Sequence, residues 1–372
     1  MNILSYFRNI SKKEYFFYII FFSPMLKLSW VCYILFILFA LYNCFNINKK
    51  SIILGLALVF AFIKLIQIGD FTVWFALIRF FWGWLFVYYL VYKKALIVSV
   101  PRLAVIFSLE IIMEFILINT ILPPSYLPNY PNLDDVSLVG FINRPYSVGS
   151  NASISGTILC IILAIYESMI KRGIIRRDRM VDNLSLIAII LFLSGTTTYL
   201  YLIYLMYRFS LLRIKTIVCL ISVIILLTIY VDNLSVDNDS ILYHSSWDYI
   251  QFIFDYKQNQ IENFLFDYKS MDSLFGYDYS KGEEPLTWGD FSIVEFYISF
   301  GIIGIILFFL FSFSKMNKTN FVAILIGLLG SLHYGGVFSI SGQLVFSLAL
   351  LLGKRNRNNN KQISKQILWM KY

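Results

Sequence analysis

The sequence predicts an all-α polytopic integral membrane protein, on the strength of its composition, its apolar runs and the placement of its basic residues. Hydrophobic residues make up 59% of the 372 residues and charged residues 14%, with a mean hydropathy of +0.71. Soluble domains carry about 25% charged residues, so an ordinary soluble domain is excluded. We expect one membrane domain over residues 1–372 with about 12 transmembrane helices, in a range of roughly 10 to 14, because a span needs about 20 apolar residues.

Apolar runs that could cross a bilayer fill most of the chain. They are drawn at residues 14–24, 28–46, 51–68, 71–92, 96–122, 151–170, 181–195, 197–212, 213–231, 292–314, 319–336 and 337–353. The first run and the pair between residues 181 and 212 are short for a span. The number of spans is therefore expected to hold to within about two.

The basic segment 171–179 gives the strongest signal for orientation, because it carries five lysine and arginine residues between two apolar runs. Assigning it to the cytoplasm and alternating the runs places 23 of the 31 lysines and arginines inside and 5 outside. Cytoplasmic loops carry such an excess, so we expect both termini in the cytoplasm. The net charge of +9 then reflects orientation in a membrane and not a nucleic-acid partner. The first run lacks a cleavage site of small residues, and we interpret it as a retained helix.

Two long segments are then expected outside the cytoplasm, at residues 123–150 and 232–291. The first begins with four prolines, which exclude a regular helix there. The second is the large extracytoplasmic loop of the C-terminal half, with 12 acidic and 3 basic residues and a local charge of −9. Apolar residues within 247–268 recur at helical spacing. This pattern indicates amphipathic helices over a cavity mouth, or equally a self-packed outer subdomain.

Five charged residues within or near the apolar runs need an explanation, namely Arg79, Arg102, Glu110, Glu114 and Lys64. Lys64 lies near the end of its run, where its long side chain can reach the membrane interface. A charge at the bilayer centre costs about 2.5 to 3.5 kcal/mol on insertion scales, so such residues face each other or a watery cavity. Glu110 and Glu114 share one helical face, and Arg102 lies about two turns away near that face. Two interpretations stay open: a structural ion pair between helices, and a cavity in which Arg79 and Arg102 bind an anionic ligand through paired hydrogen bonds.

Arg144 is the one arginine that this topology places in an outside loop. It lies in the segment 143–151 (NRPYSVGSN), just before the apolar run that begins near residue 151. Free amide groups at a helix N-terminus attract anions, and an arginine in front of them adds a positive charge. The segment is therefore a candidate anion site.

The histidines and cysteines show no metal-ligand spacing, so we expect no metal site. His244 lies in the acidic loop and could accept a proton near neutral pH. His333 is interpreted as a structural histidine. The four cysteines all lie in apolar runs and are expected to fill space there.

Five segments, in this order along the chain, resemble the O-antigen polymerase and ligase superfamily, the Wzy-type membrane glycosyltransferases of bacterial surface polysaccharides. They are 140–151 with its arginine, glycine and asparagine, 193–198 (LSGTTT), 243–247 (YHSSW), 273–277 (SLFGY) and 289–304, which runs from GDF to GIIG. The second segment lacks the usual arginine, the third has His244 where arginine is common, and the fourth lacks a second glycine. Asp290, where many ligases have a histidine, favours a polymerase.

The resemblance implies an enzyme that polymerises undecaprenyl-diphosphate-linked oligosaccharide repeat units into O-antigen, capsule or exopolysaccharide chains. The growing glycan would pass from its lipid diphosphate to the incoming unit at the outer face of the bacterial cytoplasmic (inner) membrane. No cofactor is implied. The implied partners are the lipid-linked oligosaccharide, membrane lipid, and a chain-length regulator and a flippase of the same pathway.

Three groups of residues are expected to carry this reaction. They are Arg144, Arg102 and Arg79 for binding the diphosphate, Asp290, His244 and Glu284 for accepting the proton of the acceptor hydroxyl, and Trp247, Tyr277 and Trp288 for the sugar rings. Arginines can stabilise charge on a leaving group, and carboxylates or imidazoles serve as bases. Aromatic faces suit sugar rings, although aromatic residues also anchor loops at the membrane interface.

Three alternatives stay open. An O-antigen ligase would transfer finished glycan to lipid A core or to a protein. A flippase or transporter of the lipid-linked unit would show internal repeats and short loops, which the long acidic loop disfavours. A scaffold protein of the assembly pathway would not need Arg144.

Overall fold

The structure is a computed structural model, and every regular element in the part of the chain that it describes is a helix. The described residues are 6, 10–28, 59, 63, 66, 88, 98–128, 130, 142–211, 222, 247, 248, 251, 252, 255, 258, 259, 274, 276 and 292–352. No strand occurs among them, so the expected all-α class is confirmed for this part of the chain.

Eight α-helices fall within the described ranges, each on one of the expected apolar runs. They are α1 (Lys12–Phe22), α5 (Val100–Thr120), α6 (Ala152–Lys171), α7 (Arg179–Leu191), α8 (Gly195–Arg208), α12 (Ser292–Ser314), α13 (Phe321–His333) and α14 (Ile340–Leu352). Three short 3-10 helices are η2 (Ser23–Leu26), η4 (Pro124–Tyr126) and η5 (Ser147–Gly149). The expected runs at 28–46, 51–68, 71–92 and 213–231 lie outside the described residues, apart from isolated positions.

Two of the described helices, α5 and α6, are long and apolar enough to cross a membrane. The straight part of α12 (Phe300–Ser314), α13 and α14 are apolar but shorter. A helix of 13 residues is about 20 Å long, whereas the hydrocarbon core of a bilayer is about 30 Å thick. A membrane location is therefore supported by α5 and α6 above all.

Side-chain caps set where four of these helices begin. Ser11, Asn151, Asp178 and Ser194 precede α1, α6, α7 and α8, and each accepts a backbone N–H from the first turn through its side-chain oxygen. Such caps satisfy amide groups that have no partner inside the helix, and each contributes about 1 kcal/mol. The beginnings of these four helices are thus set by residues close to them in the sequence.

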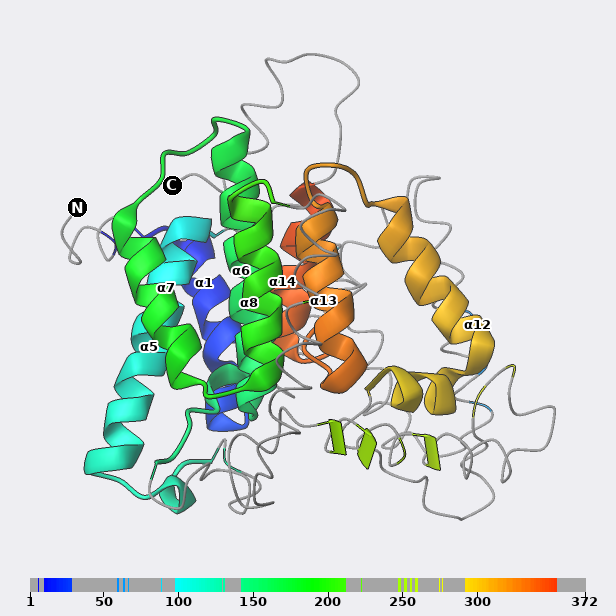
Figure 1. Cartoon of the computed structure of the whole chain (residues 1–372), viewed down its shortest axis with the longest axis horizontal. Helices are drawn as coiled ribbons and strands as arrows, with labels where there is room; N and C mark the ends of the chain where they lie inside the picture. Colours follow the sequence, from blue (N-terminus) through cyan, green and yellow to red (C-terminus); the bar gives the residue numbers. More distant parts are fainter. Residues whose placement is uncertain are drawn as a thin grey trace.

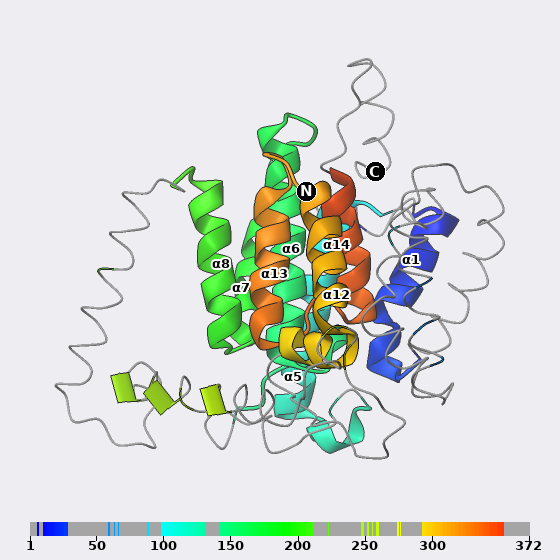
Figure 2. The ribbon, with the colours of Figure 1, turned by 90° about the vertical axis from the view of Figure 1, so that its right-hand side faces the viewer.

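Helix α6 is the centre of the bundle, packed against α5, α8, α13 and α14 (Figures 1 and 2). Most of its side chains are buried, as expected for a helix that is apolar all round. Glycines let its neighbours approach closely. A Cβ added at Gly156 would overlap Thr197 of α8, and one added at Gly330 or Gly336 would overlap Thr157 of α6. Close approach through small residues is typical of helices packed in membranes.

The helices alternate in direction, so their ends gather at two opposite ends of the bundle (Figure 1). We call one the basic end. It holds the beginnings of α1, α5, α7 and α13 and the ends of α6, α8, α12 and α14. We call the opposite end the Arg144 end. Of the described lysines and arginines, it holds only Lys27, which follows η2 after α1, and Arg144, which precedes η5 and α6. This segregation agrees with the alternation expected from the sequence.

Helix α12 is kinked at Gly301, which has φ 64° and ψ −169° inside the helix. Its first part crosses the Arg144 end of the bundle and its second part rises beside α13 (Figure 1). The backbone of Leu274 and Gly276 lies against the kink, where a Cβ on Gly301 would overlap it. The expected segments 273–277 and 289–304 therefore meet at this point.

Candidate functional site

The segment that carries Arg144 is tied to the end of α5 by a pair of asparagines. The Asn143 N–H donates to Asn119 Oδ1 at 2.8 Å, and Asn119 Nδ2 donates to the Asn143 carbonyl at 2.8 Å. The Asn143 amide also donates to the Ile118 carbonyl at 3.3 Å. Two reciprocal bonds fix both the position and the direction of the backbone just before Arg144.

Glu114, one of the two glutamates of α5, holds the backbone just after Arg144. Its side chain is buried, and its Oε1 accepts the Tyr146 N–H at 3.3 Å, the Ser147 N–H at 3.2 Å and the Tyr130 hydroxyl at 2.6 Å. Burial, and next the charge of Glu114, raise the pKa of the Tyr130 phenol well above its ordinary value. The phenol therefore stays protonated and keeps donating.

Further contacts join the same segment to Tyr130 and to Ser155 of α6. The rings of Tyr130 and Tyr146 stack with centroids 4.6 Å apart and planes 11° apart. The Ser155 hydroxyl donates to the Tyr146 carbonyl at 2.6 Å and accepts the Gly149 N–H at 2.8 Å. The segment 143–149 is thus fixed from both α5 and α6.

The backbone of this segment is strained at two serines. Ser147 has φ 49° and Ser150 has φ 52°, in the left-handed region that residues with a Cβ rarely adopt. Such a residue costs about 1 to 3 kcal/mol and persists only where its surroundings over-determine it. Here the Ser147 hydroxyl donates to Glu110 Oε2 at 2.5 Å while its N–H is held by Glu114. Strain of this kind gathers at functional sites.

Arg144 itself is partly buried, between these two anchored stretches. Its guanidinium can form two parallel hydrogen bonds to a phosphate oxygen pair. The expected role of the α6 N-terminus needs correction in one respect, because Asn151 Oδ1 accepts the Ser153 N–H at 2.7 Å. One of the amide groups that the sequence analysis expected to be free is therefore used by the helix cap.

Other segments singled out in the sequence meet at this end of the bundle. The hydroxyls of Ser153 and Ser194 lie 2.8 Å apart, which joins the start of α6 to the segment 193–198. A Cβ on Gly335, just after α13, would lie 2.8 Å from Ser292 Oγ at the start of α12. The turn after α13, the start of α12 and the starts of α6 and α8 thus share one end of the bundle.

The structure does not bring Arg102 to Arg144. Arg102 lies in the first turn of α5, and its Nη1 pairs with Glu14 Oε2 of α1 at 2.6 Å. The far end of α5, where Asn119 binds Asn143, is 17 residues away, which is about 25 Å along a helix. The single diphosphate site expected from Arg144 together with Arg102 is therefore not formed by these two residues. Among the described residues, the partner of Arg102 is Glu14, and not Glu110 or Glu114 of its own helix.

The remaining expected residues are distributed as follows. Trp247 belongs to a helical stretch and is 58% exposed. Arg79, His244, Tyr277, Glu284, Trp288 and Asp290 lie outside the described residues. Helical placement of the described positions from 247 to 259 agrees with the helical spacing noted in the acidic loop.

Sequence reasoning did not single out Asn119, Tyr130 or Glu14. Glu14 lies three residues after the cap Ser11, a spacing that marks a helix start. Asn119 is a polar side chain in the last turn of an apolar helix, which is a weak signal for a contact to the following loop. Nothing in the sequence around Tyr130 pointed to a glutamate 16 residues earlier.

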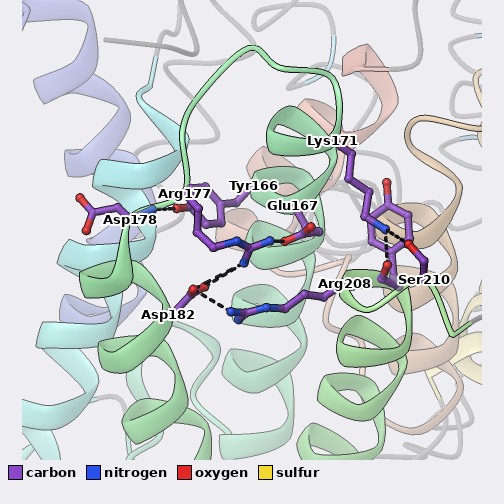
Figure 3. Close-up of polar contacts among 9 residues, drawn as sticks. Tyr166, Glu167, Lys171, Arg177, Asp178, Asp182, Arg208 and Ser210 are labelled. Atoms are coloured by element: carbon purple, nitrogen blue, oxygen red, sulfur yellow. Dashed lines mark hydrogen bonds and ion pairs between the residues drawn. The ribbon is translucent and has the colours of Figure 1, made fainter.

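A second polar cluster lies at the basic end, between α6, α7 and α8 (Figure 3). Arg177 of the α6–α7 connection donates to Glu167 at 2.5 Å and approaches Asp182 at 3.4 Å. Asp182 in turn pairs with Arg208 at the end of α8 at 2.8 Å. Burial lowers the pKa of the Arg177 guanidinium, but its hydrogen bond to Glu167 and the two acidic charges outweigh burial and raise it.

The same connection is bound to more distant parts of the basic end. The N–H of Asp178 donates to the Tyr166 hydroxyl at 2.6 Å, and its carboxylate accepts the Tyr6 hydroxyl at 2.5 Å. Lys171 donates to the Tyr207 carbonyl and to the Ser210 hydroxyl. The cluster contains as many acidic as basic side chains, namely Glu167, Asp178 and Asp182 with Lys171, Arg177 and Arg208 (Figure 3). We therefore interpret it as a structural ion-pair network that holds α6, α7 and α8 together.

Among the described residues, no group of three or more histidines, cysteines, aspartates and glutamates is placed to hold a metal ion. The Arg144 segment is therefore the candidate functional site, since it combines an anchored arginine, backbone strain and convergence of distant segments. No protein-family model, no curated protein and no solved structure matches the chain.

Proposed function

We propose that this protein is a membrane glycosyltransferase that polymerises undecaprenyl-diphosphate-linked oligosaccharide repeat units. The observation that carries the proposal is the anchored Arg144 segment, at the end of the bundle where the described parts of the superfamily-like segments gather. In this proposal the chain has about 12 spans and cytoplasmic termini, in keeping with the excess of positive charge on cytoplasmic loops. The Arg144 end then faces the periplasm or the exterior.

The reaction needs a cation where the diphosphate leaves. The bond between the anomeric carbon of the growing glycan and its diphosphate oxygen breaks, and that carbon bonds to a hydroxyl oxygen of the incoming unit. Negative charge grows on the departing lipid diphosphate, and the Arg144 guanidinium would neutralise it through paired hydrogen bonds. A fixed arginine stabilises such charge better than a mobile one, because it needs no reorganisation during the reaction.

The proton of the acceptor hydroxyl needs a base. We assign it to Asp290 or His244, with Glu284 as a further candidate, and the sugar rings to Trp247, Tyr277 and Trp288. Arg79 is a second candidate for the diphosphate. Arg102 has no part in this site, because it pairs with Glu14 at the basic end. The proposed partners are the lipid-linked unit, membrane lipid, and a chain-length regulator and a flippase.

Deletion of the gene tests the function itself. We expect surface polysaccharide that carries a single repeat unit, measured by gel electrophoresis of the surface glycan. Lipid-linked polymer that never reaches its final acceptor would indicate a ligase instead, and units trapped inside the cell would indicate a flippase.

Point variants test the residues in the same assay. Arg144→Ala and Asp290→Ala are each expected to abolish chain extension at unchanged protein abundance. Arg176→Ala is the matched control, since it removes the same charge from an exposed position at the basic end and should leave chain length unchanged. Chains of normal length in Arg144→Ala would remove that arginine from the mechanism.

A further inference from the structure

The backbone around Arg144 is held by contacts on both sides, and two of those on the C-terminal side come from one carboxylate. Asn119 binds the residue before Arg144. Glu114 binds the two N–H groups that follow Pro145, those of Tyr146 and Ser147, at 3.3 and 3.2 Å. Between these anchors the backbone of Arg144 has little freedom. The position of its Cα atom, from which the side chain extends, is therefore fixed.

A third contact carries the effect of Glu114 directly to Arg144. The Tyr130 hydroxyl donates to Glu114 Oε1 at 2.6 Å, lies 3.4 Å from the Arg144 carbonyl, and accepts the Tyr146 N–H at 3.1 Å. The carboxylate, the phenol and the loop backbone therefore form one continuous hydrogen-bonded unit. Removal of the carboxylate would take away the acceptor of the Ser147 N–H and would leave the phenol with its longer contact to the Arg144 carbonyl.

The free-energy cost of a charged side chain in a membrane helix indicates that Glu114 has a role beyond packing. A charged side chain at the centre of a membrane helix costs about 2.5 to 3.5 kcal/mol, and charged residues inside membrane helices usually mark a functional site. Glu114 lies six residues before the end of α5. Hydrogen bonds to a charged group contribute about 1.5 to 3 kcal/mol each, so several donors offset that cost. The carboxylate also accepts the N–H of Ser147, whose backbone is in the left-handed conformation.

We propose that Glu114 is a positioning residue that sets the place of the Arg144 guanidinium for a lipid-linked diphosphate. The proposal rests on the proposed function, since it takes the diphosphate as the ligand of Arg144. Glu114 does not touch the ligand. It acts through Tyr130 and the backbone of 146–147, and its loss lowers diphosphate affinity by releasing Arg144.

The test is a double-mutant cycle on the full-length protein in lipid nanodiscs, with undecaprenyl diphosphate as the probe and its affinity as the readout. Arg144→Ala is expected to weaken binding at least about 10-fold, and Glu114→Ala by a similar factor. The double variant should bind no more weakly than Arg144→Ala alone, because Glu114 acts only through Arg144. A residue that merely supports the fold would not give this non-additivity.

Glu14→Ala is the matched control, because Glu14 is an equally buried carboxylate that accepts a backbone N–H, from Ser99 at 3.1 Å, at the other end of the bundle. It should lower the unfolding temperature as Glu114→Ala does and leave diphosphate affinity unchanged. Where Glu114→Ala fails to fold, Glu114→Gln, which keeps one acceptor oxygen, and Tyr130→Phe take its place. Each is expected to weaken binding about 3-fold and to show the same coupling to Arg144.

The possible outcomes separate the two proposals. Normal affinity in Arg144→Ala would overturn the diphosphate role of Arg144, and with it the proposed site. Weak binding in Arg144→Ala with normal affinity in the Glu114 variants would overturn the positioning role alone. Losses that multiply in the double variant, or an equal loss in Glu14→Ala, would also overturn it, because either result means a general effect on the fold.

Discussion

At the scale of single residues, the same side chain has different roles according to its partner. Arg102 and Arg144 were grouped in the sequence as two cations for one ligand, yet Arg102 pairs with Glu14 of α1 at 2.6 Å. The charge of Arg102 is thus balanced by that of Glu14, and the pair lies at the basic end. Arg144 lies instead in a segment whose backbone is held on both sides, so it remains the residue for which a ligand role is proposed.

Three glycines allow a graded prediction at this scale. Gly195 has open space around it, Gly173 has open space but φ +66°, and Gly301 has φ +64° together with overlap against the backbone of Leu274 and Gly276. Gly195→Ala should leave the free energy of unfolding unchanged or slightly raised. Gly173→Ala should cost about 1 kcal/mol through its dihedral alone. Gly301→Ala should cost more than about 2 kcal/mol, because strain and overlap add.

Thermal unfolding of the purified protein in detergent measures this series. The expected order of unfolding temperatures is Gly195→Ala, then Gly173→Ala, then Gly301→Ala as the lowest. Equal temperatures for the last two variants would mean that the backbone of Leu274 and Gly276 does not press against the kink of α12.

At the scale of elements, α6 organises the bundle and the connection after it fixes its neighbours. The buried Glu167 of α6 is balanced by Arg177, and Asp182 of α7 links Arg177 to Arg208 of α8 (Figure 3). The segment 171–179 was read from the sequence as an orientation signal only. In the structure three of its cations, Lys171, Arg172 and Arg177, also bind groups of the protein itself.

Arg177→Ala tests the ion-pair network between α6, α7 and α8. It leaves the buried carboxylate of Glu167 without its counter-ion, and removing one partner of a buried pair costs about 3 to 5 kcal/mol. We expect the free energy of unfolding to fall by about 3 kcal/mol, the lower end of this range, because the Arg177 side chain is 32% exposed and water can replace part of the interaction. The measurement is the thermal unfolding temperature in detergent.

Arg176→Ala is the control for this variant. It removes the same charge one position earlier, at an exposed residue that forms no ion pair among the described residues. Its unfolding temperature should equal that of the wild type. A similar drop in both variants would show that the positive charge of the connection matters, and not the contact with Glu167.

At the scale of the whole molecule, the described basic residues gather at one end of the bundle and the Arg144 segment at the other (Figure 1). A membrane imposes such an asymmetry because cytoplasmic loops carry the excess of lysine and arginine. The two ends are therefore expected to face opposite sides of the membrane.

Cysteine accessibility in intact cells tests this orientation. In a variant whose four native cysteines are replaced by alanine, Tyr126→Cys should react with a membrane-impermeant maleimide, because Tyr126 is 74% exposed at the Arg144 end. Arg176→Cys, at the basic end, should react only after the cells are permeabilised. The reverse pattern would contradict the placement of the termini in the cytoplasm.

The sequence alone predicts the helical class, the positions of the eight described helices and the segregation of basic residues. These properties are local, since the length of an apolar run, a capping serine or asparagine and the charge of a short loop act within a few residues. The meeting of the start of α6 with the segment 193–198, through the hydrogen bond between Ser153 and Ser194, was not among these predictions.

The partner of each charged side chain, in contrast, depends on how the helices pack together. Arg102 bonds a glutamate 88 residues away, and Glu114 bonds the backbone of residues 146 and 147, although both side chains share one helix. A helix face gives the direction of a charge but does not tell which neighbouring helix or loop lies there. That choice depends on close packing between helices, such as the contacts of Thr157 with Gly330 and Gly336, and packing is a property of the whole bundle.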